Sequence, residues 1–178
     1  MIAQSLDPST SIPVDPGLYA LELQLKQSCD LVIGALGQAP FPAGSYFYIG
    51  SARGPGGLRA RILRHLRVEG KRLHWHVDHL LTQASIKGFF WTLQTGADEC
   101  ELAEWFAKYG DRRPPRFGAS DCSCPGHLVY MRQIPAWASF PGILWHLSLQ
   151  AEKEDPPYPG TVTSGERFDH IGVTKSVT

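Results

Sequence analysis

The segment that decides the fold runs from residue 45 to residue 66 and reads SYFYIGSARGPGGLRARILRHL. Its first five residues, 45–49, are largely aromatic and favour a strand. The Gly-Pro-Gly-Gly run at 54–57 then breaks the chain sharply. Beyond this bend the spacing predicts a helix over 58–68, because every fourth position along one stripe is apolar. That stripe consists of Leu58, Ile62 and Leu66.

Patterns on both sides of this segment complete an α+β domain. Strands at 19–26 and 31–33 are expected to form an antiparallel meander with the strand at 45–49. Further helices are expected over 76–83 and from an N-cap at Asp98 to 109, with further strands over 86–93 and 127–131. The predicted fold class is a small antiparallel or mixed sheet of three to four strands flanked by helices.

The chain of 178 residues has room for one domain with a full core. Residues 1–15 are rich in Ser, Pro and Asp and are expected to be a flexible lead-in. The domain itself is expected to span 16–133. Repeated prolines interrupt 134–178, which is therefore expected to be an irregular, partly disordered C-terminal extension, extended or disordered over 150–178.

The composition is that of a soluble protein. Apolar residues make up 43% and charged residues 19% of the chain. The first residues lack the charge and apolar core of a secretory signal, and no apolar run approaches the ~20 residues that cross a bilayer. Four cysteines are too few for a disulfide scaffold. We therefore expect a cytoplasmic protein with no membrane partner.

Positive charge is concentrated although the formal net charge is zero. Residues 53–72 hold seven basic side chains and one acidic side chain. Such a block is typical of a surface that binds phosphate groups, and a solvated helix face is the alternative. The arginines of this block that we assign to substrate binding are Arg53, Arg59 and Arg64.

Residues suited to phosphodiester cleavage are spread along the chain. Arg61 and His65 are four residues apart, so they project from one side of the predicted helix. A single glutamate near a helix N-terminus, such as Glu99, can hold Mg²⁺ while the ion keeps most of its waters. Hydroxyl groups of tyrosines on adjacent strands can position a water molecule or donate to a phosphate oxygen. Cleavage needs these functions together.

Three motifs resemble the GIY-YIG nuclease superfamily. Tyr48-Ile49-Gly50-Ser51-Ala52, followed by Leu58-x-x-Arg61-x-x-x-His65, is similar to its tyrosine strand, glycine turn and arginine helix. Gly17-Leu18-Tyr19 is similar to the first half of the superfamily name, and Glu99-x-x-Leu102-Ala103 to the helix that carries the metal-binding glutamate. The resemblance covers residues 16–131.

This resemblance implies a role for each matching residue. Tyr19 and Tyr48 would line the site and orient or activate water, while Arg61 would stabilise the transition state. His65 would act as a general base or orient one. Glu99 would bind Mg²⁺ or Mn²⁺. Gly50, with Ser51 beside it, would allow close approach of the substrate. The gap between the two tyrosine motifs is longer than in compact members, because the strand at 31–33 is inserted between them.

The resemblance is closest to a poorly characterised branch found alone or fused to endonuclease III-type DNA glycosylases. That branch has strings similar to 54–58, 74–78 and 117–122 of this chain. The implied function is a metal-dependent endonuclease acting on DNA in repair or defence, with a repair protein as a partner. The alternative is a non-catalytic nucleic-acid-binding module that uses the basic block at 53–72.

Three local questions stay open in the sequence. Glu99 competes with Glu101 for the metal, because residues two apart face different sides of a helix. His74 and His76 are assigned to substrate contact, although a capping or orienting role is the alternative. A structural Zn²⁺ site could be formed by three thiols and an imidazole, with buried unligated thiols as the alternative. Those four residues are Cys100, Cys122, Cys124 and His127.

Overall fold

The computed structural model describes residues 11–93, 96, 98–111, 113–134 and 145–149. Its main element is a five-stranded antiparallel sheet with the strand order β6-β4-β1-β5-β7. The strands are β1 (Gly17–Leu25), β4 (Gly44–Ala52), β5 (Ala84–Thr92), β6 (Leu128–Met131) and β7 (Trp145–Ser148). The helices are α2 (Gly57–Leu66), α3 (His76–Leu80) and α4 (Glu99–Ala107).

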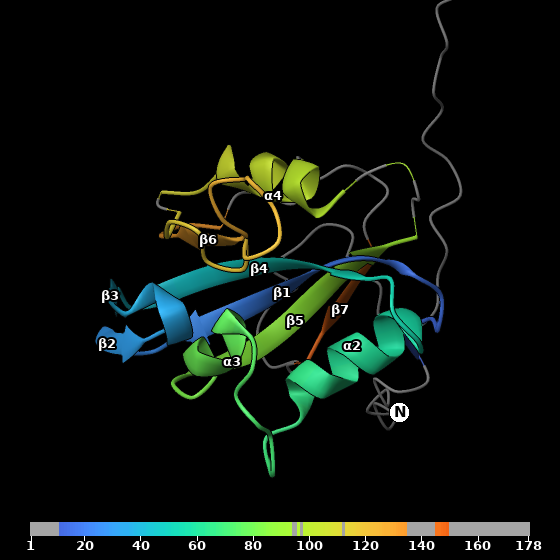
Figure 1. Cartoon of the computed structure of the whole chain (residues 1–178), viewed down its shortest axis with the longest axis horizontal. Helices are drawn as coiled ribbons and strands as arrows, with labels where there is room; N and C mark the ends of the chain where they lie inside the picture. Colours follow the sequence, from blue (N-terminus) through green and yellow to red (C-terminus); the bar gives the residue numbers. More distant parts are fainter. Residues whose placement is uncertain (1–10, 94–95, 97, 112, 135–144, 150–178) are drawn as a thin grey trace, which may run out of the picture.

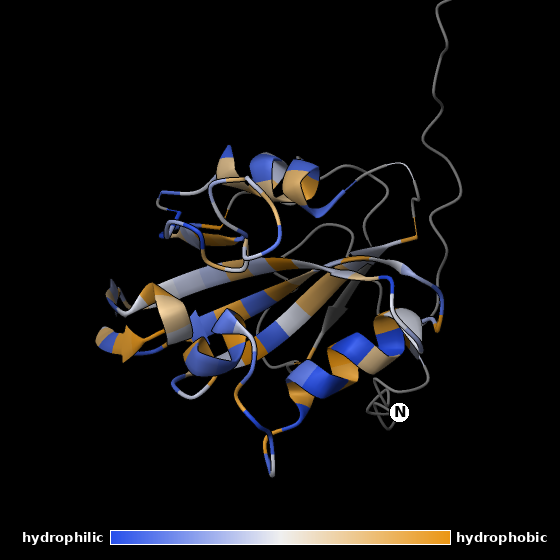
Figure 2. Ribbon diagram, in the orientation of Figure 1, coloured by the Kyte–Doolittle hydropathy of each residue, from blue (hydrophilic) through white to orange (hydrophobic). Residues whose placement is uncertain are grey.

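The helices lie on opposite faces of the sheet (Figure 1). Leu58 and Ile62 of α2 pack with alternate residues of β1 in one core, which α3 also joins. Leu102, Ala103 and Phe106 of α4 pack with Leu18 and Ala20 of β1 in a second core. Figure 2 shows α2 with hydrophobic and hydrophilic residues side by side, as expected for a helix with one face on a sheet.

β1 is buried on both faces because it is the central strand of this three-layer arrangement. Its register pairs Tyr19 with Gly50 and Leu21 with Tyr48 of β4. Side chains alternate between faces along a strand, so Tyr19 and Leu21 face the α2 side, while Leu18 and Ala20 face α4. The register therefore brings the two tyrosine motifs together on one face.

The predicted fold class is confirmed: the domain is α+β, and its antiparallel sheet is flanked by helices. The predicted three-stranded meander is wrong. β2 (Cys29–Val32) pairs with β3 (Gln38–Phe41) in a separate hairpin that includes the 3-10 helix η1 (Gly34–Leu36), and β1 pairs directly with β4. β2 is only half buried, so it lacks the two covered faces of a strand in the main sheet. The inserted hairpin thus leaves both tyrosine motifs paired.

Both ends of the domain add contacts that the sequence did not predict. Within the stretch expected to be an irregular extension, β7 pairs with residues 88–91 of β5 and adds one strand to the expected number. In the lead-in, Ile12 is fully buried, and the carbonyls of Pro13 and Asp15 accept hydrogen bonds from the first turn of α2. Our expectations for residues 1–10, 135–144 and 150–178 lie outside the described residues. No helix in the described part of the chain is long and apolar enough to cross a membrane.

Candidate active site

One pocket, lined largely by polar side chains, collects residues from β1, β4, α2, α3, α4 and the loops beside them. Its cavity volume is about 350 Å³, near the lower end of the usual range for ligand sites. It lies where β6 stops short: β6 pairs with residues 45–48 of β4, so Gly50 and Ser51 have no strand on that side. The residues that line it are Tyr19, Tyr48, Gly50, Ser51, Arg61, His65, His74, Trp75, His76, Glu99, Gly118, Ser120, Asp121 and His127.

Tyr19 and Tyr48 enter the pocket from neighbouring strands. A Cβ atom on Gly50 would lie 2.5 Å from the Tyr19 hydroxyl oxygen, so glycine at this position makes room for the phenol ring. Gly50 also lines the pocket, and its predicted role in the close approach of the substrate stays a prediction. Burial raises the pKa of both phenols well above their usual value, and the neighbouring charges only modify this effect. Both tyrosines are therefore neutral hydrogen-bonding groups near pH 7.

His65 is held behind Tyr19, with 2.8 Å between its Nε2 atom and the Tyr19 hydroxyl oxygen. Its side chain is buried, and burial lowers the pKa of the imidazole to about 3, so it is neutral. Nδ1 has no hydrogen-bond partner among the described residues. Orphaned buried N–H groups are rarer than orphaned acceptors, which favours the tautomer with the proton on Nε2. His65 then donates to Tyr19 and leaves the phenol proton available to the pocket.

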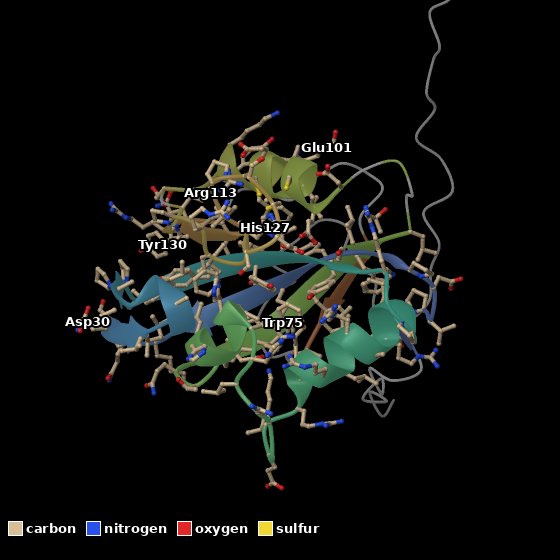
Figure 3. The ribbon with its side chains drawn as sticks, viewed as in Figure 1. Asp30, Trp75, Glu101, Arg113, His127 and Tyr130 are labelled. Atoms are coloured by element: carbon tan, nitrogen blue, oxygen red, sulfur yellow. The ribbon has the colours of Figure 1, made fainter. Side chains whose placement is uncertain are left out.

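Arg61 reaches the pocket from α2, one turn before His65. Its guanidinium carbon lies 5.0 Å from the centroid of the Trp75 ring, a cation–π contact. The ring of His74 meets Trp75 edge-on, with 4.9 Å between the ring centroids. Figure 3 shows Trp75 between α3 and α2. An aromatic surface therefore holds the arginine at the pocket without neutralising its charge.

The basic block at 53–72 is partly neutralised by Asp78 on α3, which follows that block in the sequence. Arg64 binds the two carboxylate oxygens of Asp78 at 3.2 and 2.8 Å, and Lys71 lies 2.8 Å from Oδ1. The backbone N–H groups of His74 and Trp75 also donate to this carboxylate. Burial alone would raise the pKa of Asp78, but these hydrogen bonds outweigh it and hold the pKa well below its usual range.

The three arginines assigned to substrate binding therefore lie outside the pocket. Arg64 is paired with Asp78, Arg59 donates from Nε to the carbonyl of Ile12 at 2.8 Å, and Arg53 is exposed beyond the end of β4.

The two histidines assigned with those arginines line the pocket. His76 also accepts a hydrogen bond from the backbone of Gly118 at 2.9 Å, which ties α3 to the loop over the site. Of the side chains predicted to contact the substrate, the two histidines therefore lie at the pocket and the three arginines do not.

The first turn of α4 places Glu99 in the pocket and Glu101 outside it. The Asp98 carboxylate caps the helix by accepting a hydrogen bond from the Glu101 N–H at 2.8 Å. The Glu101 carboxylate in turn accepts a hydrogen bond from the Asp98 N–H at 3.2 Å. Figure 3 shows Glu101 on the outer side of α4, away from the sheet. Of the two glutamates, Glu99 alone lines the pocket.

Beside Glu99, three thiols and one imidazole converge between α4 and the loop before β6. The Cys100 and Cys122 sulfurs both lie 3.0 Å from the Cys124 sulfur, which is 2.8 Å from Nε2 of His127. All three cysteines are free, and Figure 3 shows sulfur atoms beside His127 under α4. The four ligand atoms lie within 4.8 Å of one another, so this group could hold a metal ion. It is the one such group in the described part of the chain.

Without a bound cation, the thiols of Cys100 and Cys124 are held in their protonated form. Burial raises the pKa of the Cys100 and Cys124 thiols, and neighbouring sulfurs raise that of Cys100 further. Burial also lowers the pKa of His127, although the Glu99 carboxylate opposes this effect. A positive ion would compensate for the thiolates, because metal binding displaces thiol protons.

The sequence did not single out four residues that line the pocket: Trp75, Gly118, Ser120 and Asp121. The signal was present, because all four lie in strings that supported the resemblance at 74–78 and 117–122. A Cβ atom on Gly118 would lie 2.9 Å from the Tyr48 ring, and its φ of +77° favours glycine. Glycine therefore lets the loop close over the tyrosine.

The sheet, the arginine helix and the polar pocket together define a GIY-YIG-like domain. The model of the family "Domain of unknown function DUF123" matches residues 18–140, more than half of the chain. The chain belongs to this family, which is GIY-YIG-like. No curated protein and no solved structure matches the chain significantly. The chain is thus a DUF123 domain with a group of side chains that could hold a metal ion.

Proposed function

We propose that this protein is a divalent-metal-dependent endonuclease that hydrolyses phosphodiester bonds in DNA. One observation carries the proposal: Tyr48 and Arg61 of the segment 45–66 line the same pocket as Glu99, which comes from a distant part of the chain. Phosphodiester hydrolysis needs a cation to neutralise the non-bridging oxygens and groups that orient the attacking water. Among the described residues no carboxylate forms an ion pair with Arg61, so its charge remains available in the pocket that Glu99 also lines.

The donor set at Glu99 fits Mg²⁺ or Mn²⁺. The Glu99 side chain is 22% exposed, so its carboxylate is reachable from solvent at the pocket. One carboxylate with water completing the shell is a usual arrangement for Mg²⁺. When bound there, the ion would supply positive charge to the phosphate oxygens and lower the pKa of a water molecule.

The chain's own residues would then act in distinct ways. Arg61, held by Trp75, would bind the non-bridging oxygens as negative charge builds there. Tyr19 and Tyr48 are neutral phenols, so their suitable role is to orient water or phosphate oxygens rather than to take up a proton as tyrosinates. His65 would act through Tyr19, because its ring is buried behind that hydroxyl.

DNA is proposed as the substrate because of the finer resemblance to the branch found alone or fused to DNA glycosylases. A role in repair or defence and a partner repair protein would follow from the same resemblance. We propose Zn²⁺ for the group of three cysteines and His127, because such a ligand set is typical of structural zinc sites.

The test is a cleavage assay with plasmid, branched, abasic and single-stranded DNA in Mg²⁺ or Mn²⁺. We expect Glu99→Gln and Arg61→Ala each to lower the rate by at least ~10²-fold, as for loss of one group that stabilises the transition state. Glu101→Gln on the same helix and Arg67→Ala at the exposed end of α2 are matched controls that should cleave normally.

Two results would contradict the proposal. Metal-independent cleavage, or cleavage that survives both Glu99→Gln and Arg61→Ala, would place the chemistry elsewhere. Salt-sensitive DNA binding with no cleavage of any substrate would favour the non-catalytic binding module.

A further inference from the structure

His127 lies between the thiol group and the carboxylate proposed to bind Mg²⁺. Its side chain is 1% exposed, so both ring nitrogens face protein. Nε2 is 2.8 Å from the Cys124 sulfur, and Nδ1 is 3.6 Å from Oε1 of Glu99. The second distance exceeds that of a hydrogen bond by about 0.6 Å. A small rotation of the glutamate side chain would close this gap.

The position of the proton on the His127 ring links the thiol group on one side to Glu99 on the other. A neutral imidazole carries one N–H, and metal binding at Nε2 uses the lone pair there. The proton of His127 must then lie on Nδ1, where it faces Glu99 as a donor. Without the metal, the proton can move to Nε2, and the Nδ1 lone pair then faces a carboxylate oxygen. A metal in the thiol group thus fixes a donor toward Glu99, whereas the metal-free ring can also present a repelling acceptor.

The backbone links the same two sites. Cys100 follows Glu99 directly in the first turn of α4, so fixing the Cys100 sulfur also fixes the glutamate backbone. The loop that carries Cys122 and Cys124 supplies Ser120 and Asp121 to the pocket wall. A metal in the thiol group would therefore order both the helix turn and the loop beside Glu99.

We propose that zinc in this thiol group positions the Glu99 carboxylate through the Nδ1–H of His127 and thereby sets the affinity of the pocket for Mg²⁺ or Mn²⁺. One oxygen of Glu99 would accept from the imidazole, and the other would bind the catalytic ion. His127 is a positioning residue in this scheme. The inference rests on the proposed function, because it takes Glu99 as the ligand of that ion.

The deciding variant is His127→Cys in the full-length, zinc-loaded protein. A fourth thiolate keeps a ligand set that zinc accepts, but it has no N–H to donate to Glu99. Zinc content is measured by elemental analysis, and the thiolate-to-metal band of the Co²⁺-substituted protein reports the ligand set. Mn²⁺ affinity is then measured by electron paramagnetic resonance without substrate. Cys29→Ser, outside the thiol group, is the control.

We expect His127→Cys to retain one zinc and to bind Mn²⁺ about 10–100-fold more weakly, the usual effect of losing a group that orients a metal ligand. Wild-type protein stripped of zinc should show the same weakening and should recover on reloading. This second measurement stands even if His127→Cys does not fold. Cys29→Ser should leave both metals unaffected.

Failure of this inference can be told apart from failure of the proposed function. If Glu99→Gln abolishes Mn²⁺ binding while His127→Cys and zinc-free protein bind Mn²⁺ as tightly as wild type, the coupling through His127 is wrong and the nuclease proposal stands. A wild-type protein that takes up neither zinc nor Co²⁺ also overturns the coupling. If Glu99→Gln leaves Mn²⁺ binding unchanged, the proposed catalytic ligand is wrong.

Discussion

The buried contact between Tyr19 and His65 can be tested by a double-mutant cycle on stability. Tyr19→Phe removes the hydroxyl that lies 2.8 Å from Nε2, the one hydrogen bond of this ring among the described residues. The imidazole would then be buried with both nitrogens unsatisfied. Leaving a buried donor without a partner costs about 1–3 kcal/mol. His65→Phe makes the reciprocal change, because it removes the ring nitrogen that lies 2.8 Å from the Tyr19 hydroxyl oxygen.

The double variant should be more stable than the sum of the two single effects predicts. Replacing both partners by apolar rings leaves neither polar group stranded, so we expect a coupling energy of about 1–3 kcal/mol. Urea unfolding at pH 7, followed by circular dichroism and fluorescence, measures all four free energies of unfolding. Additivity within about 0.5 kcal/mol would refute the view that Tyr19 and His65 form one hydrogen-bonded unit.

Three further predictions concern stability. Asp78→Asn should lower the free energy of unfolding by about 3 kcal/mol, because it strands two cations around a buried group; urea titration at low and high salt measures this. The pKa of His65, about 3 in the folded protein and 6.5 ordinarily, means that the unfolded chain alone takes up a proton between these values. The contribution of His65 to the free energy of unfolding should therefore be complete above pH 6.5 and fall by up to about 1.4 kcal/mol per pH unit below it. Urea titrations at pH 6.5 and 5 measure this slope, which His65→Phe should reduce. Gly50→Ala should cost about 1–3 kcal/mol by thermal unfolding, because its Cβ would meet the ring of Tyr19, whereas Gly54→Ala, with nothing within 4 Å, should cost almost nothing.

Local signals explain why most of the fold could be predicted. The four-residue spacing of α2, the alternation in β1 and the Asp98 cap of α4 each depend on residues close in sequence, and each element formed where expected. The predicted meander missed the pairing of β1 with β4, because alternation along the sequence identifies a strand but not the strand it pairs with. A strand of the main sheet is covered on both faces, and β2 is only half buried, so the β2–β3 hairpin lies outside that sheet.

The same limit applies to charge and to the site. Residues 53–72 form a strongly basic block in the sequence. The chain between α2 and α3 nevertheless folds back and brings Asp78 against Arg64 and Lys71. The loop that carries Gly118 and Asp121 has no periodic pattern, so the sequence alone did not place it over the pocket. Tertiary contacts of this kind join residues that no local rule connects.

The first turn of α4 shows why the pocket and the thiol group depend on each other. Successive residues of a helix are about 100° apart around its axis, so four consecutive side chains point in four directions. Here Asp98 and Glu101 cap the turn through reciprocal hydrogen bonds. Between them, Glu99 faces the pocket and Cys100 faces the other thiols. A shift of the cap by one residue would turn Glu99 out of the pocket and Cys100 away from the thiols in the same movement. Any change that moves this turn should therefore weaken both proposed metal sites together.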